Sequence, residues 1–186
     1  MKKVPTSLPD VWELVPDVFK DDRGWFLETY SQKRFADLGI SDTFVQDNHS
    51  WTLKKNTLRG MHYQVNHPQA KLCRVVEGEV LDVAVDIRLG SPTFGKSASV
   101  VLSAEKKNMI FIPAGFAHGF LVTQGPAQFL YKCSDFYSKP DERGIHWADP
   151  ALGIDWGTKD ALLAPRDAEF PNLADVPHAD LPTYRG

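Results

Sequence analysis

The sequence has little of several features that would place a protein in a special class. It contains only two cysteines, Cys73 and Cys133, and neither has a second cysteine at the spacing of a metal-binding or redox pair. We therefore expect two buried thiols. The 21 basic and 24 acidic residues form no long run of either sign, so we expect no nucleic-acid partner.

Long apolar stretches are also missing. The N-terminal residues Met1–Thr6 lead into charged and proline-containing sequence without the apolar core of a signal peptide, and no stretch is long enough to span a bilayer. We expect a cytoplasmic protein that does not associate with membranes. With 186 residues, of which 42% are hydrophobic, the chain can bury one substantial core. This size favours a single domain over residues 1–186.

Apolar residues alternate with other residues through much of the middle of the chain. After the sequence Glu77-Gly78-Glu79, apolar positions alternate from Leu81 to Ile87, which predicts a strand leaving a hairpin turn. Short apolar runs follow, each bounded by Gly, Pro, Ser or Asn, at the spacing typical of an all-β sandwich or barrel. These predicted strands are residues 97–102, 109–112, 118–122 and 128–133.

Helix is predicted only at the periphery. Residues 31–38 favour a short helix that ends at Gly39, and residues 161–163 favour a single turn before Pro165. The proline-rich tail, residues 171–186, is expected to be irregular and to lie on the surface. The fold class is therefore all-β with a few short helices.

The segment Leu58–Gln64 places a cation and an imidazole three positions apart. Regular alternation would direct Arg59 and His62 to opposite faces of a strand, yet both are candidates to line one cavity. A bulge at Gly60 would redirect the residues after it, so we predict broken strand pairing there. The alternative is that Arg59 is a surface cation and His62 a hydrogen-bonded core residue.

A second segment, Ile112–Phe120, predicts a Pro/Gly turn that delivers His118 to the start of a strand. This segment resembles the second motif of cupin barrels. The first cupin motif contains His-x-His in metal-binding members, but His62 is followed here by tyrosine and glutamine, so we expect no metal. His118 is then either a buried structural residue or a substrate contact, with Asp82 as its orienting partner.

Many ordered segments together resemble the dTDP-4-dehydrorhamnose 3,5-epimerase family, which consists of metal-independent cupins. The resemblance implies a cupin-type jelly-roll barrel or sandwich and covers nearly the whole chain. The segments that carry it are residues 19–28, 46–48, 58–64, 71–80, 91–96, 113–120, 129–133 and 149–156.

By this resemblance, the substrate is dTDP-4-dehydro-6-deoxy-D-glucose, a dTDP-4-keto-6-deoxyhexose, and the reaction inverts C3 and C5 without a cofactor. His62 would remove the proton next to the ketone, and Asp167 would orient its imidazole. Lys71 would stabilise the enolate oxygen. Tyr131, a neutral phenol at pH 7, would return a proton from the opposite face of the sugar.

The resemblance also implies a set of substrate-binding residues and a homodimer with shared active sites. Residues from about 1 to 50 would contribute to the partner's site, whereas residues 157–186 would form an irregular C-terminal segment. Arg166 stands where the family usually has lysine, and Pro165 puts the path of the Asp167 loop in question. The implied substrate-binding residues are Phe19, Arg23, Glu28, Gln46, Asn48, Arg59, His118, Glu142 and Arg166.

Other functions stay open at this point. Relatives with the same base, acid and lysine invert only C3 or only C5 of a related dTDP-4-keto-deoxysugar. A metal-dependent cupin enzyme and a non-catalytic sugar-binding cupin are further alternatives, although the presence of His62, Lys71 and Tyr131 argues against the last.

Overall fold

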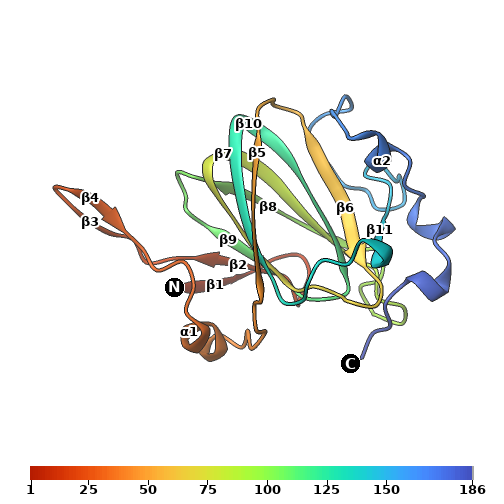
Figure 1. Ribbon diagram of the computed structural model, residues 1–186, viewed down its shortest axis with the longest axis horizontal. Helices are drawn as coiled ribbons and strands as arrows, with labels where there is room; N and C mark the ends of the chain where they lie inside the picture. Colours follow the sequence, from red (N-terminus) through yellow and green to blue (C-terminus); the bar gives the residue numbers. More distant parts are fainter. Residues whose placement is uncertain (186) are drawn as a thin grey trace.

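The computed structural model describes residues 1–185, and most of its regular structure is antiparallel β-strand (Figure 1). The strands are β1 Lys2–Pro5, β2 Trp12–Val15, β3 Phe19–Asp21, β4 Gly24–Phe26, β5 Gln46–Thr52, β6 Leu58–Gln64, β7 Lys71–Asp86, β8 Ser97–Ser103, β9 Met109–Ile112, β10 Phe116–Cys133 and β11 Glu142–Gly144. The helices are α1 Gln32–Asp37 and α2 Pro165–Ala168, with short 3-10 turns at Lys139–Asp141, Leu173–Asp175 and His178–Asp180.

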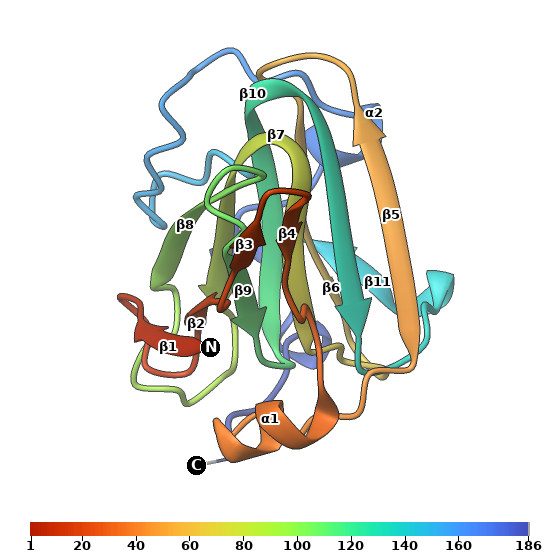
Figure 2. The same ribbon diagram turned by 90° about the vertical axis from the view of Figure 1, so that its left-hand side faces the viewer.

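Two long strands, β7 and β10, organise the barrel because each contributes to both of its layers. The first half of β7 pairs with the second half of β10, and the remaining halves pair with each other across register shifts. Both strands curve over at the same end of the barrel (Figure 2). Strands β9, β2, β1 and β5 extend the first pair into layer A, and β8, β6 and β11 extend the second pair into layer B.

The curved region corrects one prediction from the sequence. Glu77-Gly78-Glu79 is not a hairpin turn, because β7 continues through it and remains beside β10. Gly78 has a φ of +74°, and a Cβ atom there would lie 2.3 Å from the carbonyl oxygen of Pro126, so glycine permits the close crossing of the two strands. The predicted strands at 118–122 and 128–133 are likewise two parts of β10.

The two layers enclose an apolar core that also supports the site. Phe120 on layer B and Phe129 on layer A stack with their ring centroids 4.1 Å apart. The outer face of layer A packs against a second cluster of buried residues, which includes Phe35 of α1. The outer face of layer B packs against the C-terminal segment. This antiparallel two-layer architecture confirms the predicted all-β cupin-type jelly roll.

The helix predictions were right in one case and wrong in another. Helix α1 ends beside Gly39, which has a φ of +79°, as the sequence predicted. Residues 161–163 form no helical turn; instead Leu162 bridges to Thr57, and helix α2 starts at Pro165, whose fixed φ and missing N–H suit the first helical position. No helix in residues 1–185 combines the length and apolar character needed to cross a membrane.

The C-terminal tail lies on the outside of layer B but is more than surface chain. Leu173, Val176 and Leu181 are each no more than 7% exposed and pack against residues of β6, β7 and β10. Two 3-10 turns interrupt the tail. Residue 186 lies outside the described residues, so the prediction for the tail is tested only to residue 185.

Candidate active site

A cavity of about 860 Å³ lies among β6, β10 and the loop that leads into α2. Most of the catalytic and binding residues predicted from the sequence line it, although they come from segments far apart in the chain. Those residues are Arg59, His62, Lys71, His118, Tyr131, Glu142, Arg166 and Asp167.

The turn of β6 at Gly60 explains how Arg59 and His62 reach the same cavity. In the pairing with β10, His118 lies opposite His62 and Phe120 lies opposite Arg59, so β6 contains one extra residue between these pairs. Gly60 has a φ of +124°. The predicted break in strand pairing is therefore present, and it is a β-bulge that realigns the two side chains.

Asp167 holds His62 in place from helix α2. His62 Nε2 lies 2.9 Å from Asp167 Oδ1, and the backbone N–H of Gly60 donates to Asp167 Oδ2 at 3.0 Å. Burial would raise the pKa of Asp167, but the hydrogen bond and charge of His62, the Gly60 N–H and Arg166 together lower it below its usual value. The carboxylate therefore stays ionised and can orient the imidazole.

Lys71 and Tyr131 project from the same face of neighbouring strands. In the β7–β10 register, Tyr131 lies opposite Cys73 and Lys71 lies opposite Cys133, so both reach the cavity side. Burial raises the pKa of Tyr131 to about 12. The phenol is consequently protonated at neutral pH and available as a proton donor.

His118 and Asp82 form a buried pair in the wall of the cavity, as the sequence suggested. His118 Nε2 lies 3.0 Å from each Asp82 oxygen. Burial lowers the pKa of His118, and the carboxylate of Asp82 opposes that shift. The imidazole lines the cavity and is only 6% exposed.

Glu142 and Arg166 form an ion pair at the rim. Arg166 Nη1 and Nη2 donate to the Glu142 oxygens at 2.6 and 2.8 Å, and the Tyr137 hydroxyl donates to Glu142 Oε2 at 2.7 Å. Burial opposes ionisation of Glu142, yet these bonds keep its pKa below the usual value. The sequence analysis missed Tyr137, which lies in a loop where no periodicity marks which residues face a cavity.

Gln46 and Asn48 line an adjoining hollow of about 240 Å³, which shares His62, Lys71 and Tyr131 with the main cavity. Gln46 Nε2 donates to Asn48 Oδ1 at 3.1 Å. These two residues extend the polar surface away from the catalytic candidates along β5.

Ser50 is a further residue that the sequence analysis missed. It lines the main cavity, two positions beyond Asn48 on β5, and therefore faces the same side as Asn48. Its Oγ atom is buried and has no hydrogen-bond partner within residues 1–185. Because a buried hydroxyl normally has a partner, a substrate that shifts the side chains around it could supply one. Alternation along β5 was the signal that could have identified it.

Three of the predicted binding residues lie outside both the main cavity and the adjoining hollow. Phe19 and Arg23 belong to the β3–β4 hairpin, which projects away from the barrel (Figure 1). Arg23 bonds to Asp21 on the same hairpin, and Glu28 bonds to Arg34 of α1 at 3.2 Å. The hairpin also exposes large aromatic side chains, with Phe19 and Phe26 at 63% and 69%.

The cavity can therefore support proton transfer to and from carbon. It combines an oriented imidazole, a protonated phenol and an ammonium group, which are a base, an acid and a stabiliser of developing negative charge. The arginines and polar side chains beside them suit a substrate that carries phosphate.

Comparison with known proteins gives consistent results for the whole chain. Residues 5–175 match the family described as dTDP-4-dehydrorhamnose 3,5-epimerase. A relative with that name from Shigella flexneri is 49% identical over 178 residues, which cover 95% of this chain and 98% of the relative. A dTDP-4-dehydrorhamnose 3-epimerase from Streptomyces niveus is 37% identical and covers 99% of this chain and 90% of its own length.

A solved structure agrees with the fold as well. The crystal structure of dTDP-6-deoxy-D-glucose-3,5-epimerase from Legionella pneumophila, in complex with dTDP-4-keto-L-rhamnose, superposes with a TM-score of 0.96. The two chains are 45% identical, and the match covers 100% of this chain and 99% of the other. The similarity therefore extends over all layers of the barrel.

Proposed function

Because this chain belongs to the dTDP-4-dehydrorhamnose 3,5-epimerase family, we propose that it inverts C3 and C5 of dTDP-4-dehydro-6-deoxy-D-glucose. The observation that carries the proposal is the cavity in which His62, Lys71 and Tyr131 meet. Each inversion removes one proton and returns another, so the reaction is redox-neutral and requires no electron-carrying cofactor. The product would serve the synthesis of a deoxysugar of the dTDP-L-rhamnose type.

His62 acts as the base in this proposal. A neutral imidazole can accept a carbon proton near pH 7, and the hydrogen bond that His62 donates to Asp167 fixes the ring and stabilises the imidazolium that forms. A proton next to a ketone becomes acidic enough only when the enolate oxygen meets positive charge or hydrogen-bond donors. Lys71, with the imidazole of His118 beside it in the cavity wall, supplies that stabilisation.

Tyr131 acts as the acid. Inversion requires that the proton returns from the face opposite to the one from which it was taken, so acid and base must come from different elements. Tyr131 is on β10 and His62 is on β6. The pKa of Tyr131, about 12, keeps the phenol protonated until the enolate accepts its proton.

The remaining polar residues bind the nucleoside diphosphate. Arg59 and Arg166 present planar guanidinium groups, which match phosphate oxygens in pairs. Arg166 can release Glu142 to do so, since their ion pair lies at the open rim. Tyr137, which is 52% exposed beside the same rim, offers an aromatic surface on which the thymine ring of the nucleotide can stack.

A homodimer with shared active sites belongs to the same proposal. The exposed aromatic residues of the β3–β4 hairpin need a surface to cover them, and Phe19, Arg23 and Glu28 lie outside the cavity of their own chain. If two chains exchanged their hairpins, the exposed aromatic residues would be covered, and Phe19, Arg23 and Glu28 would lie near the cavity of the other chain. A cytoplasmic location is also proposed, because two free, buried thiols suit a reducing compartment.

The test is proton NMR of the purified protein with dTDP-4-dehydro-6-deoxyglucose in deuterated water. We expect deuterium at both C3 and C5, together with the inverted product. Deuterium at only one carbon would assign the chain to the single-centre epimerases, such as its relative from Streptomyces niveus. No exchange by folded protein would refute the proposed function. His62→Ala is the matched control and should show no exchange at either carbon.

A further inference from the structure

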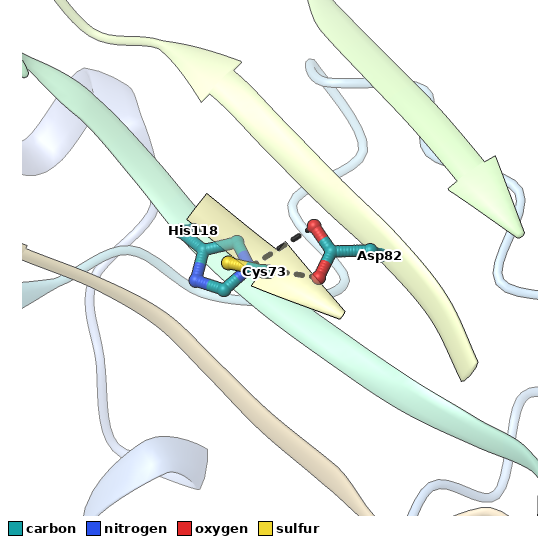
Figure 3. A group of neighbouring side chains, drawn as sticks. All are labelled: Cys73, Asp82 and His118. Atoms are coloured by element: carbon teal, nitrogen blue, oxygen red, sulfur yellow. Dashed lines mark hydrogen bonds and ion pairs between the residues drawn. The ribbon is translucent and has the colours of Figure 1, made fainter. Parts of the chain in front are cut away.

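A thiol, a carboxylate and an imidazole meet in the interior of the barrel, where layers A and B face each other (Figure 3). Cys73 comes from the first half of β7, Asp82 from its second half, and His118 from β10. Cys73 Sγ lies 4.0 Å from His118 Nε2, which lies 3.0 Å from both Asp82 oxygens. All three ligand-type atoms fall within 4.8 Å of one another.

This group has fewer hydrogen bonds than its burial demands. Asp82 is fully buried, yet within residues 1–185 the side chain of His118 is its sole hydrogen-bond donor. A carboxylate can accept about four hydrogen bonds, and a buried one that accepts so few is costly. Cys73 is equally buried, and within residues 1–185 its sulfur has one hydrogen-bond contact, at 4.0 Å to His118 Nε2. An added cation would satisfy both groups.

We propose that Cys73, Asp82 and His118 bind a thiophilic divalent cation, with Zn²⁺ as the best match. In a tetrahedral zinc site, bond lengths of about 2.0–2.3 Å put neighbouring ligand atoms roughly 3.3–3.6 Å apart. His118 Nε2 lies 3.0 Å from Asp82 and 4.0 Å from Cys73 Sγ, and no pair of the three atoms is more than 4.8 Å apart, so small side-chain shifts would bring them to those separations. The thiolate selects Zn²⁺ over Mg²⁺ and Ca²⁺, which prefer oxygen ligands.

His118 connects this zinc site to the cavity. It is the member of the group that lines the cavity, so an ion can enter from that side and keep its fourth position toward water. On binding, the Cys73 thiol loses its proton to solvent, and the His118 proton moves from Nε2 to Nδ1 so that Nε2 can coordinate. With Nε2 bound to the ion, the ring cannot take up a second proton, so it cannot offer an enolate the positive charge of an imidazolium.

Zn²⁺ is therefore expected to inhibit the enzyme, a consequence that rests on the proposed function. The binding itself does not rest on it. Chelator-treated protein that binds no zinc but epimerises the sugar would refute the zinc site alone, whereas protein that binds zinc but shows no exchange after chelation would refute the proposed function alone.

The experiment is a titration of chelator-treated protein with ZnCl₂, followed by equilibrium dialysis and metal analysis, and a parallel titration with CoCl₂. We expect one ion per chain and a thiolate-to-cobalt charge-transfer band. Cys73→Val keeps an apolar, strand-compatible side chain and should weaken zinc binding by about tenfold or more, remove the band and retain activity in the presence of EDTA.

Two further variants serve as a control and as a substitute for Cys73→Val. Cys133→Val removes the other buried thiol, which lies outside the group, and should still give the cobalt band. Cys73→Ala replaces Cys73→Val if the latter does not fold. Native protein that binds less than stoichiometric zinc, or a Cys73 variant that binds zinc as tightly as the native chain, would overturn the proposal.

Discussion

His62 Nε2 lies 2.9 Å from Asp167 Oδ1, although the two residues are 105 positions apart in the chain. The other oxygen of the carboxylate accepts the backbone N–H of Gly60 at 3.0 Å. Asp167 thus fixes both the imidazole and the bulge that directs it into the cavity. One side chain on a short C-terminal helix consequently sets the orientation of the proposed base.

Replacement of Asp167 by asparagine tests this role. The amide oxygen can still accept from Gly60, but the negative charge that stabilises the His62 imidazolium is lost. We expect Asp167→Asn to lower kcat roughly a hundredfold with little change in KM. Steady-state kinetics will measure both, and circular dichroism will check the fold. An unchanged kcat would show that His62 does not depend on this carboxylate.

Tyr131→Phe should separate proton removal from inversion. His62 can still remove a proton and return one to the same face, so deuterium from the solvent should continue to enter the sugar. Without the phenol, the opposite face receives no proton, and formation of the inverted product should fall by about 10²-fold or more. NMR in deuterated water detects exchange and configuration together. Inversion at close to the native rate would exclude Tyr131 as the acid.

Ser50→Ala should weaken substrate use without a cost in stability. The hydroxyl has no partner within residues 1–185, so its removal breaks no bond of the free protein. One lost hydrogen bond to the substrate would lower kcat/KM by about three- to tenfold. Ser134→Ala is the control, because the Ser134 Oγ accepts the Ala70 N–H at 2.8 Å. That variant should lose stability in urea denaturation while it retains its kcat/KM; the reverse pattern would refute the assignment.

Gly60→Ala should destabilise the fold severely. A Cβ atom at Gly60 would lie 2.5 Å from Gly119 Cα and 2.8 Å from the His118 carbonyl oxygen, at a φ of +124°. We expect the free energy of unfolding to fall by about 3 kcal/mol or more. Gly153→Ala is the control, since Gly153 has a φ of +60° and open space, and it should cost about 1 kcal/mol. Equal losses in urea titrations at one protein concentration would show that backbone strain alone matters.

Local patterns in the sequence predicted those elements that depend only on residues close together in the chain. Strand β9 follows from a short apolar run, and the bulge follows from a glycine between Arg59 and His62. The curvature of β7 at Gly78 could not be predicted, because a glycine that ends a hairpin and a glycine that lets two strands cross leave the same local signature.

The residues of the site also fall into two groups, those that the sequence predicted and those that it did not. The strand residues were predicted from the family resemblance, because regular alternation alone would direct Arg59 and His62 to opposite faces. The hydroxyl of Tyr137, by contrast, reaches Glu142 from an irregular loop. The grouping of Cys73 with His118 depends on how the two layers face each other, and no period along a single strand contains that information.

The shared site of the proposed dimer can be tested by mixing two inactive chains. Arg23→Ala damages the hairpin that would reach the partner's cavity, and His62→Ala removes the base from its own cavity. In a mixed dimer, the cavity with native His62 receives the hairpin with native Arg23, so one site of the two is intact. A fully exchanged equal mixture should therefore recover roughly a quarter of native activity. Native mass spectrometry will verify that mixed dimers form. If they form without any recovered activity, Arg23 does not act across the interface, and the hairpin contributes only to association.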